Sequence, residues 1–376
     1  MSRARDFADL AGSADAGGLT GRNLLINSAM TVSQRGTSTS SVTSSGYHAA
    51  DRWKIDYASA GTWTVSQSTT APTGFANSFK MDCTTADASL SAGDALIFNQ
   101  RIEGQNLQHL KKGTSDAESV TLSFWVRSSK TGTYIAELLD NDNTRAYSQS
   151  YTISSANTWE HKTLTYSGDT TGGLGNDNGL SLYVNFWLAA GTNFTSGTLA
   201  TAWASKTDAN RAVGQVNLAD STSNEWYITG VQLEVGENAS DFEHRSFGEE
   251  LSLCQRYFQT FSYNTWERVA SGTFHVWHSA TDRSFFTNIM FPEMRTTPTG
   301  STSRTDGTPY LRANDRGSTG GSVVENSGTL SMSCKTPTGC EVAFQTASNT
   351  YQPGSNGNLS LGGGSGDIVL DMDAEL

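Results

Sequence analysis

Short segments that alternate between apolar and polar residues recur through most of the chain, and they constrain the fold more than any other feature. Between residues 22 and 247 such segments occupy residues 62–66, 119–126, 133–139, 159–166, 181–188 and 226–235, with polar turns between them. A period of two places alternate side chains on opposite faces of a strand. Short strands repeated at this spacing are typical of a β-sandwich or jelly roll. We therefore expect an all-β fold, interrupted at residues 103–112 by one or two amphipathic helical turns.

The composition agrees with this pattern. The chain of 376 residues contains 37 Gly, only 6 Pro and 16% charged residues, and it is rich in Ser and Thr. Ser, Thr, Gly and Asn are unfavourable in helix interiors, so this composition favours turns and strands. The 9 Trp, 12 Tyr and 16 Phe are enough to fill a core, which excludes a wholly disordered chain.

The first part of the chain, residues 1–21, is predicted to be a short helix followed by a Gly-rich connector. Ala4, Phe7, Ala8 and Ala11 fall on one helical face. A helix this short is not stable alone in water, so its apolar face must pack on another surface. We therefore predict that this segment attaches the protein to a partner.

The rest of the chain divides into two β domains at a helix-like stretch, residues 249–258. We expect a jelly-roll domain at residues 22–247 and a smaller C-terminal β domain at residues 248–376. The strands expected in the smaller domain are residues 273–279, 284–291, 329–334, 341–346 and 367–372. Residues 296–321 are almost all turn-forming residues and are predicted to be turns.

Charge and hydropathy exclude several classes of partner. The chain has 25 basic and 37 acidic residues, a formal net charge of −12, and no cluster of Lys and Arg that would bind phosphates. We therefore expect neither nucleic acid nor an anionic membrane as a partner, and no apolar run is long enough to span a bilayer. Residues 1–20 lack the apolar core of a signal peptide. We expect a protein that is made in the cytoplasm and released by lysis, as virion parts are.

Motifs for catalysis or metal binding are weak or absent. None of the 6 His lies in a metal or catalytic motif, and no Gly-x-Ser-x-Gly elbow occurs. The paired carboxylates of a glycosidase need no local motif, so that alternative stays open. Residues 172–177 (GGLGND) and 140–143 (DNDN) imitate parts of calcium-binding loops, but neither motif is complete, and Arg145 stands where an EF-hand requires Gly. We predict a turn and a hairpin tip there, and no catalytic residue, metal or cofactor.

Cysteines and aromatic residues give the remaining predictions. Cys334 and Cys340 flank a turn sequence, so a disulfide is possible, but assembly in a reducing cytosol favours thiols. Trp125 and Trp187 lie inside apolar strands and are predicted to be core residues. Six polar or aromatic residues of the C-terminal domain are candidates for glycan binding, the aromatic ones by stacking on a sugar ring and the polar ones by hydrogen bonding: Trp266, Trp277, Tyr310, Tyr351, Arg312 and Asp315. Packing against a neighbouring chain explains the aromatic ones equally well.

Several stretches together resemble a family of tailed-bacteriophage fibre proteins. They are residues 22–30 (RNLLINSAM), 33–36 (SQRG), 50–53 (ADRW), 100–103 (QRIE), 122–127 (LSFWVR), 230–236 (GVQLEVG), 250–258 (ELSLCQRYF) and 373–376 (DAEL). The start of the chain, residues 2–6 (SRARD), is also similar to the start of such fibres. The resemblance implies a jelly roll like that of carbohydrate-binding modules, a homotrimer, adsorption to the host and no enzymatic activity. Such fibres often carry long shafts before these motifs, whereas only a short segment precedes them here.

The leading hypothesis from the sequence is a virion structural protein, a short phage fibre or spike that attaches to a host-surface receptor, most simply a glycan. It is expected to be a homotrimer joined to other virion proteins of the tail, neck or capsid, with Phe7 and Leu10 as the virion-attachment residues. The alternatives are a free carbohydrate-binding lectin and a polysaccharide-degrading tailspike. A surface poor in charge but rich in hydroxyls, amides and aromatic rings suits a neutral glycan better than a phosphate.

Overall fold

The computed structural model describes residues 21–263, 268–270, 275–278, 283–304, 311–314, 322–325, 328–346, 356–360 and 368–376. Side-chain surroundings are described for residues 21–261, 288–302, 331–343 and 369–376. The chain divides into two compact units, one ending at Cys254 and the other running from Gln255 to Glu375, with Leu376 grouped with the first. The boundary predicted between residues 247 and 248 coincides with the start of helix α3 (Phe247–Gln255), and the structural division lies near the end of that helix.

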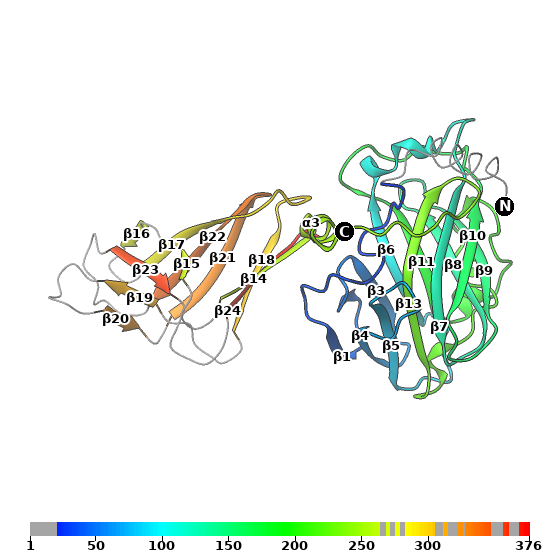
Figure 1. The fold of residues 1–376 in the computed structure, drawn as a ribbon, viewed down its shortest axis with the longest axis horizontal. Coiled ribbons are helices and arrows are strands. Elements are labelled where there is room, and N and C mark those ends of the chain that lie inside the picture. Colours follow the sequence, from blue (N-terminus) through cyan, green and yellow to red (C-terminus); the bar gives the residue numbers. More distant parts are fainter. Residues whose placement is uncertain are drawn as a thin grey trace. The chain divides into compact units, whose positions relative to one another are not determined.

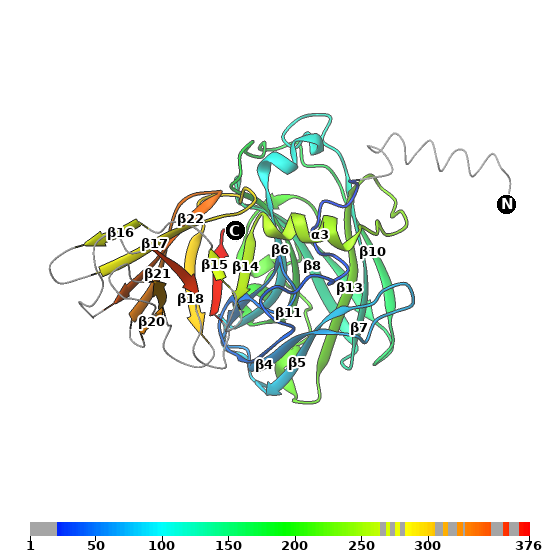
Figure 2. The same cartoon turned by 60° about the vertical axis from the view of Figure 1, so that its left-hand side comes forward.

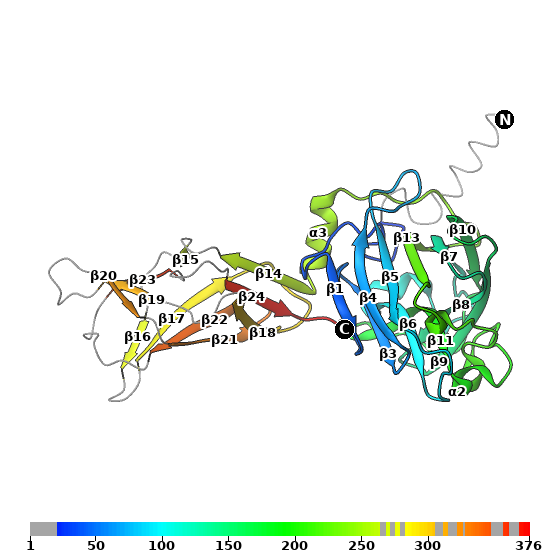
Figure 3. The ribbon, with the colours of Figure 1, turned by 90° about the horizontal axis from the view of Figure 1, so that it is seen from below.

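The first unit is a β-sandwich of two antiparallel sheets (Figure 1). The six-stranded sheet has the order β1 (Ser38–Val42), β4 (Thr62–Ser68), β5 (Ser78–Thr85), β13 (Glu225–Val235), β7 (Val120–Ser128) and β10 (Glu160–Tyr166). The seven-stranded sheet has the order β12 (Ala204–Ser205), β9 (Arg145–Ile153), β8 (Gly132–Asp140), β11 (Leu180–Ala190), β6 (Ala95–Glu103), β3 (Trp53–Ala58) and β2 (Gly46–Tyr47). Figure 3 shows β1, β4, β5 and β13 side by side in the first of these sheets. The predicted all-β fold with a β-sandwich domain is confirmed.

The alternation of the sequence decides which side chains enter the core between the sheets. In β4 the side chains of Trp63 and Val65 are buried, whereas the intervening hydroxyls are partly exposed. Aromatic rings fill the centre: Trp53 stacks on Phe98 with ring centroids 4.7 Å apart, and Trp226 meets Phe98 edge-on at 5.5 Å. Burial of such rings is the main favourable term in folding, because it removes large apolar areas from water.

Short helical segments lie in the loops of this unit. They are η1 (Gly104–Asn106), η2 (Gln108–Leu110), α2 (Thr192–Thr195), η3 (Asp208–Asn210) and η4 (Leu218–Asp220). The first two confirm the helical turns predicted at residues 103–112. The segment between β11 and β13 carries the other three and covers part of the outer face of the seven-stranded sheet. There Trp187 packs with Ile97, Ile135 and Ala212 in a second, smaller cluster.

In the residues that the structure describes, the second unit consists of three small antiparallel sheets (Figure 2). Their strand orders are β14 (Phe258–Tyr263), β24 (Ile368–Asp373) and β18 (Thr299–Arg304); β15 (Arg268–Ala270), β23 (Asn356–Ser360), β19 (Leu311–Asn314) and β20 (Ser322–Glu325); and β16 (His275–His278), β17 (Arg283–Met290), β22 (Gly339–Thr346) and β21 (Gly328–Thr336). A smaller C-terminal β domain was predicted, and its five expected strands correspond to β16, β17, β21, β22 and β24.

Three local predictions in this part of the chain were wrong. The helix ends at Gln255, and Phe258 begins β14 instead, because it pairs with Asp373 of β24. Residues 296–321 are not all turn, since β18 and β19 lie within them and gain their hydrogen bonds from partner strands distant in sequence. Cys334 and Cys340 face each other across the β21–β22 hairpin and form a disulfide, because cross-strand neighbours of an antiparallel pair have adjacent Cβ atoms.

Candidate functional site

The structure places few of the residues predicted to bind glycan or to attach to the virion. The residues Trp266, Tyr310, Asp315, Tyr351, Phe7 and Leu10 lie outside the described residues. Trp277 lies on β16 opposite Ser284, and Arg312 lies on β19 opposite Val324; only their backbones are described. These two strands belong to different sheets, so the backbone does not bring Trp277 and Arg312 onto one sheet face.

Several of the motifs that carried the resemblance to phage fibres form a structural junction in the first unit. Asn27 is its centre: its side-chain Nδ2 donates hydrogen bonds to the carbonyls of Val32 (2.8 Å) and Asp51 (2.9 Å), and its Oδ1 accepts from Thr31 and Val32 N–H, both at 2.9 Å. The indole of Trp53 donates to the Asn27 carbonyl at 3.0 Å. Asn27 has a φ of 54°, which Asn tolerates better than most residues.

The same junction fastens the segment after residue 21 to both sheets. Gln100 of β6 exchanges two hydrogen bonds of 2.7 Å with the backbone of Ile26. Asn23 donates to the Val231 carbonyl at 2.9 Å and accepts from Leu233 N–H at 3.1 Å, both in β13. Because β6 and β13 belong to opposite sheets, the segment closes one end of the sandwich. The motifs at residues 22–30, 50–53, 100–103 and 230–236 are therefore explained by the architecture of this junction.

Aromatic side chains, some of them accessible to solvent, gather instead on the outer face of the six-stranded sheet. We define the aromatic face by Trp125, Arg127, Trp159, His161 and Tyr227. Strand register fixes their arrangement: Tyr227 lies opposite Arg127, and Trp125 lies opposite His161. Trp125 and Trp159 are partly buried and His161 is exposed, so solvent reaches these three side chains, whereas Tyr227 is buried beneath its neighbours with 5% of its surface exposed. Adjacent strands are about 4.8 Å apart, so the two spacings from β13 to β10 give this face a width of about 10 Å.

The rings of the aromatic face contact one another. Trp125 and His161 have centroids 5.0 Å apart with an interplanar angle of 51°. Trp159 meets Tyr227 edge-on at 6.2 Å, and the Arg127 guanidinium carbon lies 4.7 Å from the Tyr227 ring centre. Trp125 was predicted to be a core residue, but it is absent from the buried core and faces outward. Trp187, the other predicted core tryptophan, is fully buried.

Charged groups border the aromatic face and are paired. Lys80 Nζ lies 2.6 Å from Glu225 Oε1 and 3.4 Å from Asp82 Oδ2, and the Tyr227 hydroxyl donates to Glu225 Oε2 at 2.8 Å. Arg127 donates through Nε to the Asn157 carbonyl at 2.9 Å. The positive and negative side chains balance, so the face attracts no highly charged ligand.

These contacts also set the protonation of the face. Burial alone would raise the pKa of Glu225, but the hydrogen bonds from Lys80 and Tyr227 lower it below its ordinary value. Burial, together with the hydrogen bond to Glu225, raises the pKa of Tyr227. Partial burial lowers the pKa of His161. At neutral pH the face therefore presents a carboxylate, a phenol and an imidazole that favours its neutral form.

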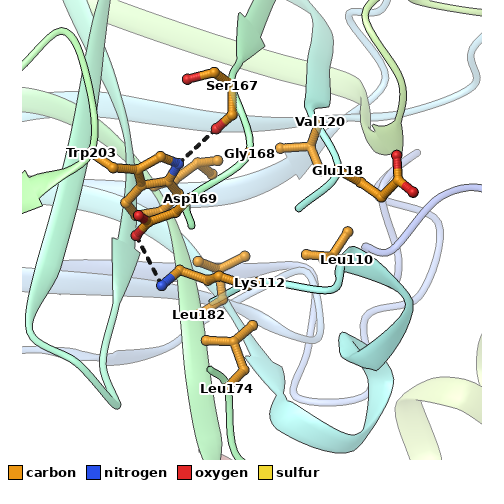
Figure 4. Close-up of a pocket in the computed structure, with 11 residues that line it drawn as sticks. Leu110, Lys112, Glu118, Val120, Ser167, Gly168, Asp169, Leu174, Leu182 and Trp203 are labelled. Carbon is orange, nitrogen blue, oxygen red and sulfur yellow. Dashed lines mark hydrogen bonds and ion pairs between the residues drawn. The ribbon is translucent and has the colours of Figure 1, made fainter. Parts of the chain in front are cut away.

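A pocket and a surface depression at one end of the sandwich are less suited to a sugar. The pocket of Figure 4 has a volume of about 20 Å³, which holds about one water molecule. Trp203 covers it and donates to the Ser167 carbonyl at 2.8 Å, while Lys112 pairs with Asp169 at 3.0 Å. A neighbouring depression of about 420 Å³ shares Lys112 and Leu174 with the pocket, but no aromatic side chain lines it.

Among the described residues there is no group of three or more His, Cys, Asp or Glu that holds a metal ion. No described helix is long and apolar enough to cross a membrane. The rings of the aromatic face can stack on a ligand, and its charged side chains, which are already held in place by their partners, can form hydrogen bonds with it.

No known protein family matches this sequence, and no curated protein matches it. Among solved structures, the chain is similar to the enzymatically active domain of tailspike protein 4 of bacteriophage CBA120, with 18% identity and a TM-score of 0.30 over 57% of this chain and 21% of that chain. It thus spans about a fifth of that tailspike domain.

Two further similarities cover almost all of the other protein. A putative sugar binding protein from Bacteroides thetaiotaomicron has 15% identity and a TM-score of 0.33 over 57% of this chain and 100% of that chain. A family 11 carbohydrate-binding module from Clostridium thermocellum, in complex with a mixed-linked tetrasaccharide, has 10% identity and a TM-score of 0.27 over 55% of this chain and 98% of that chain.

Proposed function

We propose that the protein is a virion structural protein, a short phage fibre or spike, that binds a host-surface glycan and catalyses no reaction. The observation that carries the glycan-binding part is the aromatic face. Partly exposed rings supply flat apolar surface for the apolar faces of sugar rings, and neighbouring paired charges supply fixed donors and acceptors for sugar hydroxyls. The virion part is supported by the resemblance of the sequence motifs to phage fibres.

The ligand is a neutral glycan under this proposal. Lys80, Arg127, Asp82 and Glu225 bring balanced charge to the face, so a polyanionic polysaccharide gains nothing from it. The face is an open strip across three strands, with no wall at either end formed by its defining residues. It therefore suits a stretch of several sugar units inside a chain better than a chain end. Binding at each site is weak, and several copies on one particle multiply it through effective concentration.

The site is tested by binding of the purified protein to host surface polysaccharide in affinity electrophoresis. Trp125→Ala and His161→Ala should each weaken binding at least about tenfold, equivalent to about 1.4 kcal/mol. Phe247→Ala is the matched control, because Phe247 is 61% exposed but lies outside the aromatic face. Equal binding by wild type and Trp125→Ala contradicts the site. Trp266→Ala and Trp277→Ala, measured in parallel, test the residues that the sequence nominated.

The virion role needs its own experiment. Mass spectrometry of purified particles should find the protein in the virion. Absence of the protein from the particles would contradict the virion role and favour the hypothesis of a free lectin. Release of reducing ends from the polysaccharide would instead indicate the degrading tailspike. Size-exclusion chromatography with light scattering should give three times 40.2 kDa if the protein is a homotrimer. A truncation that lacks residues 1–21 should fold but not join particles.

A further inference from the structure

The ammonium group of Lys112 lies in a cage of oxygen atoms, in which the carboxylates are buried and the carbonyl of Thr171 belongs to an exposed residue. Its Nζ is 2.5 Å from Asp140 Oδ2, 3.0 Å from Asp169 Oδ2, and 3.0 and 2.9 Å from the carbonyl oxygens of Thr171 and Gly172. The side chains of Lys112, Asp140 and Asp169 are 6%, 0% and 3% exposed. An ammonium group has three N–H donors, but four oxygen atoms surround this one. The arrangement therefore resembles the shell of oxygen ligands around a cation.

Two loops whose sequences imitate parts of calcium-binding loops meet at this cage. Asp140 ends β8 and begins the hairpin tip at residues 140–143, and Gly172 begins the stretch at residues 172–177. Asn143 Nδ2 donates to the Gly173 carbonyl at 2.9 Å, and Asp142 Oδ2 accepts from Gly175 N–H at 2.8 Å. Each motif is incomplete alone, but the fold joins them around one cation.

The charges of the cage balance only while Lys112 is present. Arg145 donates to both oxygens of Asp169, through Nε at 2.7 Å and Nη2 at 3.0 Å. Two carboxylates therefore face two cationic side chains. Burial alone would raise the pKa of Asp169, but the hydrogen bonds from Arg145 and Lys112 lower it. Without the ammonium, one negative charge would remain uncompensated on the two buried carboxylates, at a cost in free energy.

We propose that this cage is a cation-binding site that the chain fills with its own ammonium group, and that calcium binds there once the Lys112 side chain is shortened. Carboxylate and backbone carbonyl oxygens are the ligands that calcium prefers, at 2.3–2.6 Å and with six to eight oxygens in total. The oxygens around Nζ lie at 2.5–3.0 Å, so a contraction of a few tenths of an ångström and some water ligands complete the shell. Magnesium requires about 2.0–2.1 Å and therefore a larger contraction.

The experiment compares thermal unfolding of the full chain with calcium, with magnesium and with a chelator. Lys112→Ala empties the cage, whereas Lys112→Met removes the same charge but fills the space with an apolar chain of similar length. Lys112→Ala should melt below wild type in chelator and rise by about 5–10 °C at a calcium concentration 100-fold above its dissociation constant. Trp203, whose ring centre is 5.3 Å from Lys112 Nζ, should report binding through its fluorescence.

Wild type and Lys112→Met should not respond to calcium, and magnesium should act more weakly than calcium on Lys112→Ala. A folded Lys112→Ala protein that melts equally in calcium and chelator overturns the proposal, and so does an equal calcium response in wild type or Lys112→Met. If Lys112→Ala is not recovered folded, the titration is repeated with Lys112→Asp, which adds a third carboxylate to the cage. Absence of a calcium-dependent transition in that variant also overturns the proposal.

Discussion

A buried ion pair on the outer face of the seven-stranded sheet leads to a quantitative stability prediction. Glu137 is completely buried, and its carboxylate accepts hydrogen bonds from Arg211 Nε and Nη2 and from Asn185 Nδ2, all at 2.8 Å. The Arg211 guanidinium carbon also lies 4.9 Å from the ring centre of Trp187. Arg211 belongs to the segment between β11 and β13, so the pair fastens that segment to the sheet.

Arg211→Met keeps much of the side-chain volume but leaves Glu137 as a buried carboxylate without its cation. Removing one partner of a buried ion pair costs about 3–5 kcal/mol. A change of 1 kcal/mol moves the melting temperature of a domain this large by about 2–4 °C, so we expect a decrease of about 6–20 °C. The double variant Glu137→Gln/Arg211→Met leaves no unpaired charge and should recover most of this loss.

Differential scanning calorimetry of the single and double variants measures the coupling directly. The control is Lys111→Met, which breaks the exposed ion pair between Lys111 and Glu118 (2.5 Å) and should leave the melting temperature unchanged. A decrease in Arg211→Met no larger than in this control would refute the reasoning. A double variant as unstable as Arg211→Met would show that lost packing, not the unpaired carboxylate, causes the effect.

Gly230→Ala should destabilise the first unit in urea unfolding by at least about 2 kcal/mol more than the control Gly236→Ala. Both glycines have positive φ, but a Cβ added at Gly230 would lie 2.5 Å from the Phe75 ring, whereas one added at Gly236 would meet no atom within 4 Å. The pKa of Asp169 is lowered in the folded state, so the stability it contributes is present above its unfolded value of about 3.9 and is lost as pH falls through the lower folded value. The melting temperatures of wild type and Asp169→Asn should therefore converge on acidification from about pH 5 to 3, and a constant difference would contradict this. Cys334→Ser/Cys340→Ser opens a disulfide with a sequence separation of 6 and should cost the second unit about 2 kcal/mol by calorimetry, with the transition of the first unit unchanged.

Local alternation was enough to predict strands that are buried on one face only. β4 and β10 alternate because one face meets the core and the other meets solvent, so their sequences carry a period of two. β6 was missed for the opposite reason. All but one of its residues are buried, since one face meets the core and the segment between β11 and β13 covers part of the other, and its residues 95–98 are apolar without interruption, so they show no alternation. Strands such as β18 have no apolar pattern and exist because a distant partner pairs with them.

The candidate glycan site was harder to predict than the fold. From the sequence we predicted that aromatic residues in polar surroundings of the C-terminal domain bind the glycan. The aromatic face, in contrast, lies in the first unit. Its sequence signal was Trp125 and Arg127 at alternate positions of one strand, together with Trp159 directly before β10 and His161 within β10. Recognising it required the register that places Trp125 opposite His161, and register depends on pairing between residues far apart in sequence.

Trp125 and Trp187 show the difference between what the sequence determines and what only the tertiary structure decides. Both stand in apolar, alternating strands, and the sequence by itself determined that each would belong to a β-sandwich with its side chain on a sheet face. Only the tertiary structure decided whether each of these side chains is buried or exposed. The segment that carries Arg211 covers Trp187 and buries it completely, whereas Trp125 lies on a face where its ring meets His161 and stays partly exposed. Which sheet face a distant loop covers is a matter of long-range packing, and the local period of two is the same for a covered and an open face.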